Sequence, residues 1–161
     1  MNGIPVTRNS TIGLLSEQVV MLRQYEGDGE LRCGGTTLKP DMILTAGHCC
    51  QEMEDYLKSG IDTIKDFSIL AKSLNLEDLY KQRQEIQVSN YAIHEHFAQS
   101  TYFDEAAQND ICLVKLDKDI ELVQAINVSD VIDPYAGTEC IILGWGQTLV
   151  NPKIVRYHQA C

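Results

Sequence analysis

Short apolar runs, separated by turn residues, set the pattern of hydrophobic and polar positions along this chain. Each run spans only a few residues and is rich in apolar or β-branched side chains, which is typical of strands. Helical character is confined to the turn after His48 and to Glu52–Lys58. Because short strands bounded by turns recur along the chain, the pattern predicts an all-β sandwich or barrel. The expected strands are Gln18–Leu22, Met42–Thr45, Phe67–Ala71, Ile86–Val88, Ile111–Leu116 and Cys140–Leu143.

The composition predicts a single globular domain. Hydrophobic residues make up 44% of the 161 residues, which is enough to bury a core and excludes a disordered chain. The sequence contains no internal repeat and no low-complexity tract. Asp133–Thr138 is the best candidate for a connector, because Pro and Gly punctuate it.

The formal net charge is −10 at pH 7. This acidity predicts neither a nucleic-acid partner nor a membrane partner, since such anionic surfaces require clustered Lys and Arg. No apolar run approaches the roughly 20 residues needed to span a bilayer. Residues 1–10 lack the basic start and apolar centre of a signal peptide, so we expect any secretion signal to lie outside this sequence.

Cysteine usage leaves two interpretations open. The sequence has no CxxC pair, so a zinc site of the common kind is not expected. The cysteines are then either buried free thiols or a disulfide set formed in an oxidising compartment. They are Cys33, Cys49, Cys50, Cys112, Cys140 and Cys161.

One of the four histidines stands directly beside two cysteines, in the segment LTAGHCC at residues 44–50. A histidine beside cysteine would be weak evidence alone, but it belongs to an ordered series of segments that resembles the trypsin/chymotrypsin family of serine endopeptidases. The inclusion of TAGHC and GWG makes the series specific. Its segments are CGGT at 33–36, MILTAGHC at 42–49, SLNL at 73–76, IHEHF at 93–97, NDICLVKL at 109–116 and AGTECIILGWGQT at 136–148.

The resemblance assigns catalytic roles to two residues. His48 matches the general base, which takes the proton of the nucleophile and returns it to the leaving amine. Asp110 matches the carboxylate that fixes the histidine tautomer and stabilises the imidazolium. Without the surrounding motifs, His48 would be interpreted as a core or turn histidine and Asp110 as a cap or turn aspartate at a strand start.

The resemblance also implies a disulfide between Cys33 and Cys49. In the chain-entropy model, closing a loop of this length stabilises the folded state by about 3 kcal/mol. Cys50 is an addition to the family pattern. It stands two positions after His48, and Cys112 stands two positions after Asp110, so a second bridge between Cys50 and Cys112 is expected if the catalytic pair is in contact. Cys140 matches a family cysteine whose partner lies beyond residue 161. Cys161 has no clear counterpart, and we expect both to be unpaired here.

The nucleophile of the family is missing from the sequence. It lies in a Gly-Asp-Ser-Gly-Gly segment whose amides form the oxyanion hole, and no such segment occurs here. None of the serines has a glycine on both sides or a matching place in the order of the family motifs. We therefore expect a fragment that is inactive alone. Met1-Asn2-Gly3 resembles the mature start of the family without its leading Ile, so the activating amine is not expected either.

The implied fold is a trypsin-like double β-barrel, truncated at its C-terminal end. Residues 1–122 form the complete first six-stranded barrel in this interpretation, and residues 123–161 form the connector and the opening hairpin of the incomplete second barrel. In the family the active site lies between the two packed barrels. We therefore expect apolar surface to be exposed around Val123–Val131, Ile141–Leu143 and Trp145, and the isolated chain to aggregate or express poorly.

Neither a metal nor another cofactor is expected. His94 and His96 alternate along a strand as metal ligands sometimes do, but no third ligand stands at a useful spacing. Some family members bind calcium in a loop after the strand near Leu70. The first ligand position there corresponds to Lys72, whose positive charge opposes calcium.

The resulting functional prediction is a secreted serine-type endopeptidase. The alternative is a non-catalytic pseudo-protease that acts as a binding or regulatory module, and a third hypothesis is a small non-enzymatic β-barrel module. The retained His48 and Asp110 favour the first. The resemblance implies a polypeptide substrate and leaves room for protein inhibitors or an activating protease as partners. Its primary specificity is open, because the pocket lies in the missing part. Enlarged loops are expected at 51–65 and 99–108, beside the cleft.

Overall fold

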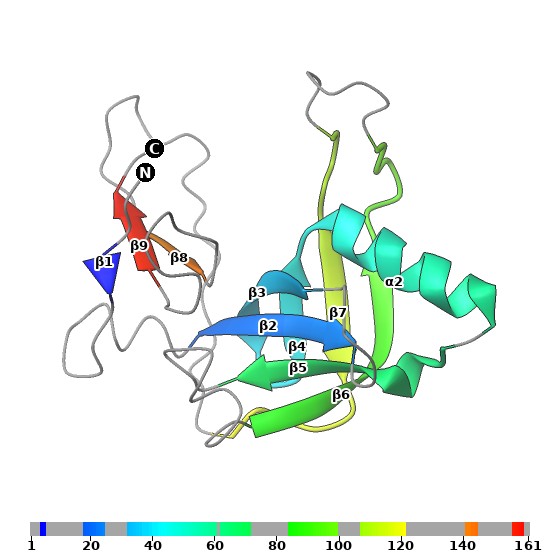
Figure 1. The fold of residues 1–161 in the computed structure, drawn as a ribbon, viewed down its shortest axis with the longest axis horizontal. Helices are drawn as coiled ribbons and strands as arrows, with labels where there is room; N and C mark the ends of the chain where they lie inside the picture. The colour runs from blue at the N-terminus through cyan, green and yellow to red at the C-terminus, as the bar shows by residue number, and fades with distance from the viewer. Residues whose placement is uncertain are drawn as a thin grey trace.

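The structure is a computed structural model, and it describes residues 4–5, 18–24, 32–60, 62–71, 84–99, 107–121, 141–144 and 156–159. Strands dominate the described part, together with one α-helix and a short 3-10 helix (Figure 1). The elements are β1 (Ile4–Pro5), β2 (Val19–Gln24), β3 (Arg32–Lys39), β4 (Met42–Thr45), α2 (Gly47–Ser59), η1 (Ile64–Asp66), β5 (Phe67–Ala71), β6 (Gln84–Ile93), β7 (Cys112–Leu116), β8 (Ile141–Gly144) and β9 (Arg156–Gln159).

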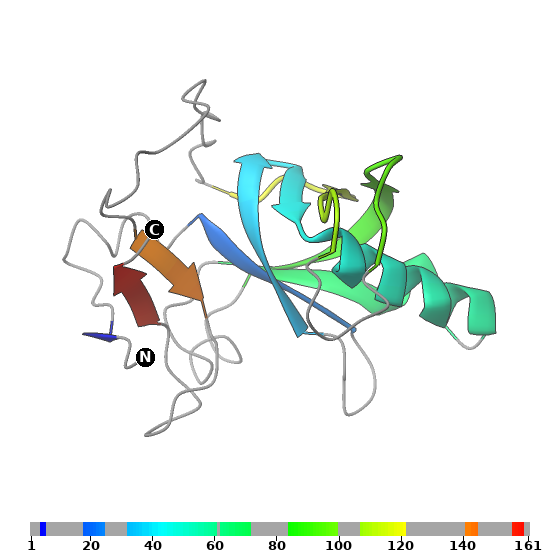
Figure 2. The ribbon, with the colours of Figure 1, turned by 90° about the horizontal axis from the view of Figure 1, so that it is seen from above.

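Six strands form a closed antiparallel barrel in the order β2-β3-β4-β7-β6-β5 (Figures 1 and 2). The barrel closes where β2 pairs with β5, with Met21 opposite Leu70 and Gln24 opposite Phe67. Closure leaves no unpaired sheet edge, which removes a template for aggregation. The predicted all-β class and the six-stranded barrel are thus confirmed.

Apolar side chains from all around the barrel meet in its interior. Inward positions alternate along β7, where Cys112, Val114 and Leu116 are buried. Each fully buried large apolar side chain contributes roughly 1.5–3 kcal/mol to stability. The largest such side chains are Phe67, Leu22, Ile43, Met53, Ile69, Leu70, Ile120, Val20, Val88 and Val114.

Strand β3 was not expected from the sequence. Its segment, RCGGTTLK, contains no apolar run. Gly35 lies where a Cβ atom would meet Ile43 Cγ2 at 2.8 Å and the Leu44 carbonyl oxygen at 3.1 Å. The side chains of the neighbouring strands therefore fill the space beside β3, and the strand itself needs a small residue there.

The barrel begins later than the expected boundary at residue 1. Its first strand is β2, and β1 instead pairs with β9 in a separate three-stranded sheet of order β1-β9-β8. Ile4 lies opposite Tyr157 in that sheet. The backbone of residues 4–5 therefore finds its pairing partner near the C-terminal end of the chain. The start of the second unit stays a prediction, because residues 122–140 lie outside the described part.

Helix α2 merges the two predicted helical patches into one element of 13 residues. It lies against β6 and β7, and its C-terminal half projects beyond the barrel strands (Figures 1 and 2). Met53 anchors it in the barrel core. Gly60 ends it with φ +76°, a left-handed conformation that glycine adopts without strain. In the described part, no helix is both long and apolar enough to cross a membrane.

Candidate active site

Two adjacent strand ends bring His48 and Asp110 together. Thr45, the last residue of β4, pairs with Cys112, the first residue of β7. The chain leaving β4 turns at once into α2, which places His48 in the first helical turn. The chain entering β7 passes through Asp110 two residues before the strand. The antiparallel pairing of β4 with β7 therefore accounts for a contact between residues 62 positions apart.

Both carboxylate oxygens of Asp110 accept hydrogen bonds from His48. The His48 Nδ1 atom lies 2.8 Å from Asp110 Oδ2. The His48 backbone N–H donates to Asp110 Oδ1 at 2.7 Å. An ionised carboxylate only accepts hydrogen bonds, so in the neutral ring Nδ1 carries the proton and Nε2 keeps a lone pair. This is the tautomer that a general base needs.

The environment of Asp110 keeps its carboxyl group ionised. Burial raises the pKa of this carboxyl group. Its pKa is lowered by hydrogen bonds from the side chain and backbone of His48, by the charge of His48 and by the backbone N–H of Gly47. The net effect is a pKa below the usual value for aspartate. Asp110 is therefore negatively charged at neutral pH, where it orients His48 and stabilises its protonated form.

Asp110 is also the acceptor for the first turn of helix α2. The residue before the helix, Ala46, offers no side-chain cap. The backbone N–H of His48 is among those that a helix leaves without internal partners, and it donates to Asp110 Oδ1. A carboxylate at a helix N-terminus is favoured by the helix dipole. The capping role that sequence reasoning weighed against catalysis thus coexists with the contact between Asp110 and the His48 ring.

Asn109 sets the backbone that presents Asp110. It has φ +50°, a left-handed conformation that asparagine tolerates better than most residues. Its side-chain amide donates to the His96 carbonyl at 2.9 Å, and its own carbonyl accepts from the Ile111 N–H at 2.7 Å. Sequence reasoning noted Asn109 as the start of a motif but gave it no role; asparagine directly before the aspartate was the available signal.

Gly47 allows the helix to approach Asp110. A Cβ atom at this position would lie 2.8 Å from Phe97 Cδ2 and 3.2 Å from Asp110 Oδ1. The first distance is shorter than real Cβ contacts, so a side chain here would displace the Phe97 ring or the carboxylate. Sequence reasoning did not single out Gly47, although a glycine directly before the histidine indicates a close approach.

The structure contains both disulfides considered from the sequence. Cys33 of β3 is bonded to Cys49 of α2, with their Cα atoms 6.2 Å apart. Cys50 is bonded to Cys112, with a Cα separation of 6.4 Å. This separation lies below the limit of about 7 Å that a disulfide tolerates. Cys140 and Cys161 lie outside the described residues.

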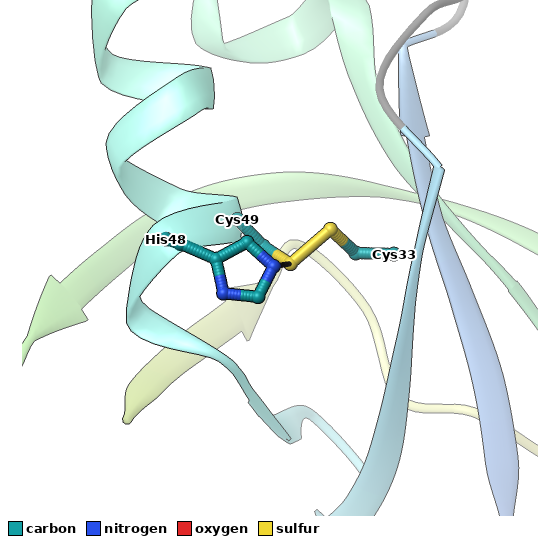
Figure 3. A group of neighbouring side chains, drawn as sticks. All are labelled: Cys33, His48 and Cys49. Carbon is teal, nitrogen blue, oxygen red and sulfur yellow. Dashed lines mark hydrogen bonds between the residues drawn. A yellow bond between two sulfur atoms is a disulfide. The ribbon is translucent and has the colours of Figure 1, made fainter. Parts of the chain in front are cut away.

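The Cys33–Cys49 disulfide lies directly against the imidazole (Figure 3). His48 Nε2 is 3.4 Å from Cys49 Sγ. Cys33, His48 and Cys49 form the one group of three potential metal ligands in the described part of the chain, but both sulfur atoms are consumed in the disulfide. A metal needs deprotonated thiolates, so this group offers only the imidazole.

His48 is partly open to solvent. Its side chain is 53% exposed, compared with 29% for Asp110. A disulfide sulfur carries no proton, so Cys49 cannot donate to Nε2. Three serines lie in the described part, and their hydroxyl groups donate elsewhere: Ser59 to Tyr56, Ser68 to Glu85 and Ser89 to Lys115. Nε2 is thus available to a group that these residues do not supply.

The histidines at 94 and 96 bond to each other and to nearby groups. The His96 N–H donates to His94 Nδ1 at 3.1 Å, and His96 Nε2 lies 3.6 Å from Glu95 Oε1. Neither histidine belongs to the group of three potential ligands found among the described residues. Lys72, which occupies the position of the first calcium ligand in some family members, lies outside the described residues.

Comparison with known proteins agrees with the motifs. Residues 7–159 match the Trypsin family. Hypodermin-A from Hypoderma lineatum is 30% identical over 129 residues, which cover 78% of this chain and 43% of that protein. Chymotrypsin-like elastase family member 3B from Homo sapiens is 30% identical over 139 residues, which cover 80% of this chain and 45% of that protein. The chain thus spans less than half the length of these relatives. Because the family match extends over most of the chain, the resemblance predicted from its motifs is confirmed, and the chain belongs to the trypsin family.

Proposed function

We propose that this chain carries the general base and its carboxylate partner of a serine endopeptidase. The observation that supports the proposal is the paired hydrogen bonding of His48 to Asp110, with the His48 side chain 53% exposed and its Nε2 not used in the contact with Asp110. A histidine oriented in this way by a carboxylate is the arrangement that activates a serine hydroxyl.

In the proposed reaction, His48 Nε2 takes the proton of the serine hydroxyl as its oxygen attacks the peptide carbonyl carbon. Asp110 keeps Nδ1 protonated and stabilises the resulting imidazolium. His48 then donates the proton to the leaving amine. The serine and the oxyanion hole belong to the Gly-Asp-Ser-Gly-Gly segment of the family, which this sequence lacks. The 161 residues are therefore proposed to be inactive alone.

The proposed setting is extracellular, with polypeptides as substrates. Two disulfides support this setting, because such bonds persist in oxidising compartments and are rare in the cytosol. Protein inhibitors and an activating protease are the further partners that the family suggests.

The transcript beyond the codon for Cys161 provides the first test. An open frame that continues into Gly-Asp-Ser-Gly-Gly is expected, and it would supply the missing nucleophile. A stop codon directly after Cys161 would exclude triad catalysis by this product and would favour the alternative of a binding module.

The longer product then tests the roles of the two residues. His48→Ala should lower kcat/KM by about 10⁴-fold or more, because loss of a triad histidine leaves only the binding and oxyanion contributions. His96→Ala is the matched control, since its side chain is 76% exposed and outside the His48–Asp110 pair. It should leave kcat/KM within about threefold of the parent, as most surface substitutions do. Equal activity of His48→Ala and the parent would contradict the proposal.

A further inference from the structure

The first turn of helix α2 is bound covalently to two different strands. Cys49 and Cys50 are adjacent in sequence, and adjacent residues of a helix point in directions about 100° apart. Cys49 therefore reaches β3 through Cys33, whereas Cys50 reaches the first residue of β7, Cys112. This turn is the part of the helix that carries His48.

The second of these links runs parallel to the catalytic pair. Each of its cysteines lies two residues after a member of the pair, so Cys50–Cys112 and His48–Asp110 span the same sequence separation of 62. Both cysteines are fully buried, whereas the two paired side chains are partly exposed. The disulfide thus fixes, on the core side, the same two backbone segments that the hydrogen bonds join on the solvent side.

Besides the pairing of Thr45 with Cys112 and the burial of Met53, the non-covalent support for this junction comes from hydrogen bonds to Asp110. Ala46 supplies no cap, and the two hydrogen bonds from His48 go to a carboxylate that is 29% exposed and therefore accessible to water. The Cys33–Cys49 bridge fixes the turn relative to β3 only. Of the two disulfides, Cys50–Cys112 alone ties the helix start to the segment that presents Asp110.

We propose that Cys50 and Cys112 are positioning residues, whose disulfide holds the first turn of α2 against the start of β7 and so keeps His48 and Asp110 in contact. Its value for catalysis rests on the endopeptidase function proposed above. The contact itself lies within this chain, so it can be measured in the longer product as well, and it requires no substrate.

The test compares two ways of removing one disulfide from the same helical turn. Cys50→Ala with Cys112→Val removes the proposed positioning link, with valine chosen to fill space in a buried strand. Cys33→Ala with Cys49→Ala is the matched control, because it removes the other link of that turn. Far-UV circular dichroism and the spectrum of core methyl groups establish that each variant keeps the barrel.

Two signals report on the pair directly. The first is amide hydrogen exchange of His48, whose N–H donates to Asp110, measured relative to Leu116, whose N–H donates to Asp41 within the barrel. The second is the pH titration of the Asp110 carboxyl carbon by NMR. Among the described residues, His48 is the titratable group hydrogen-bonded to Asp110.

The positioning variant should exchange the His48 amide at least about tenfold faster relative to Leu116, as expected for a locally opened segment. The pKa of Asp110 should rise toward its ordinary value in this variant. The control should change the relative exchange by less than about threefold and should keep the Asp110 pKa low.

Two results from the positioning variant would overturn the proposal: an unchanged His48 amide exchange and Asp110 pKa, or changes equal to those of the control variant. If the positioning variant loses the barrel, Cys50→Ala with Cys112→Ala is measured in its place. If this second variant also unfolds, the disulfide serves the whole fold rather than the pair, and the proposal is wrong. These readouts involve no proteolysis, so their failure leaves the proposed function standing, and an absence of proteolysis leaves the positioning role standing.

Discussion

At the scale of single residues, Asp110 connects local structure to chemistry. Its carboxylate accepts from the His48 ring and from the backbone of the first helical turn. The neighbours that make this possible are Gly47, which leaves room for the carboxylate, and Asn109, whose left-handed backbone turns the chain into β7. The family resemblance selected His48 and Asp110, which are proposed as the catalytic pair. It did not predict these supporting roles, which depend on distances between segments far apart in sequence.

The lowered pKa of Asp110 predicts how stability depends on pH. A carboxyl group with a lower pKa in the folded state stabilises the protein above its unfolded pKa of about 3.9, and this contribution disappears as pH falls through the folded value. Asp110→Asn should therefore lower the free energy of unfolding at pH 7, and its difference from the parent should shrink below about pH 4. Urea unfolding at several pH values measures this. A difference that stays constant into the acid range would contradict it.

At the scale of elements, the sequence predicted the strands that contain apolar runs better than the strand that lacks one. Met42–Thr45 and Phe67–Ala71 have the expected bounds, because each is a continuous run of apolar or β-branched residues. Strand β3 was missed, since its fit depends on glycine lying beneath Ile43 of the next strand. The region after His48 was expected to be an enlarged loop with a helical patch. It forms one helix because Met53 anchors it in the core.

Docking of α2 on the barrel should depend strongly on Met53. This side chain is fully buried, so Met53→Ala should destabilise the protein by about 2–5 kcal/mol through lost burial and a cavity. Glu52→Ala, at the preceding exposed position of the same helix, should change stability by less than about 0.5 kcal/mol. Thermal and chemical unfolding of the two variants provide the measurement. Similar losses for both would show that α2 does not pack as described.

At the scale of the whole molecule, a closed barrel is joined to a small sheet that uses both ends of the chain. The barrel buries its own core and has no free edge, whereas the sheet β1-β9-β8 pairs Ile4–Pro5 with residues 156–159. The strand pattern predicted an all-β sandwich or barrel, and the family resemblance implied the six-stranded barrel. Neither predicted the pairing of the two chain ends, because strand patterns carry little information about long-range partners.

The isolated chain is still predicted to self-associate. Ile111, beside Asp110, is 49% exposed. Of the segments expected to add apolar surface, Val123–Val131 and Trp145 lie outside the described part, and Leu143 of β8 is partly buried. The prediction requires further apolar side chains to join Ile111 in one patch, because contiguous apolar surface promotes association. Size-exclusion chromatography with light scattering should show oligomers or aggregates. A monodisperse monomer that melts cooperatively would contradict the prediction.

Asp110 bonds to the His48 ring and also accepts a hydrogen bond from the backbone of α2. These two contacts affect how a relative of this chain would lose catalysis in evolution. Replacing His48 removes the proposed base but keeps the backbone N–H that bonds to the carboxylate, so the start of α2 survives. Replacing Asp110 by an apolar residue removes the acceptor of that turn as well as the orienting group. Inactivation through the histidine therefore costs less folding stability. Descendants that abandon proteolysis while keeping this barrel should retain the aspartate more often than the histidine.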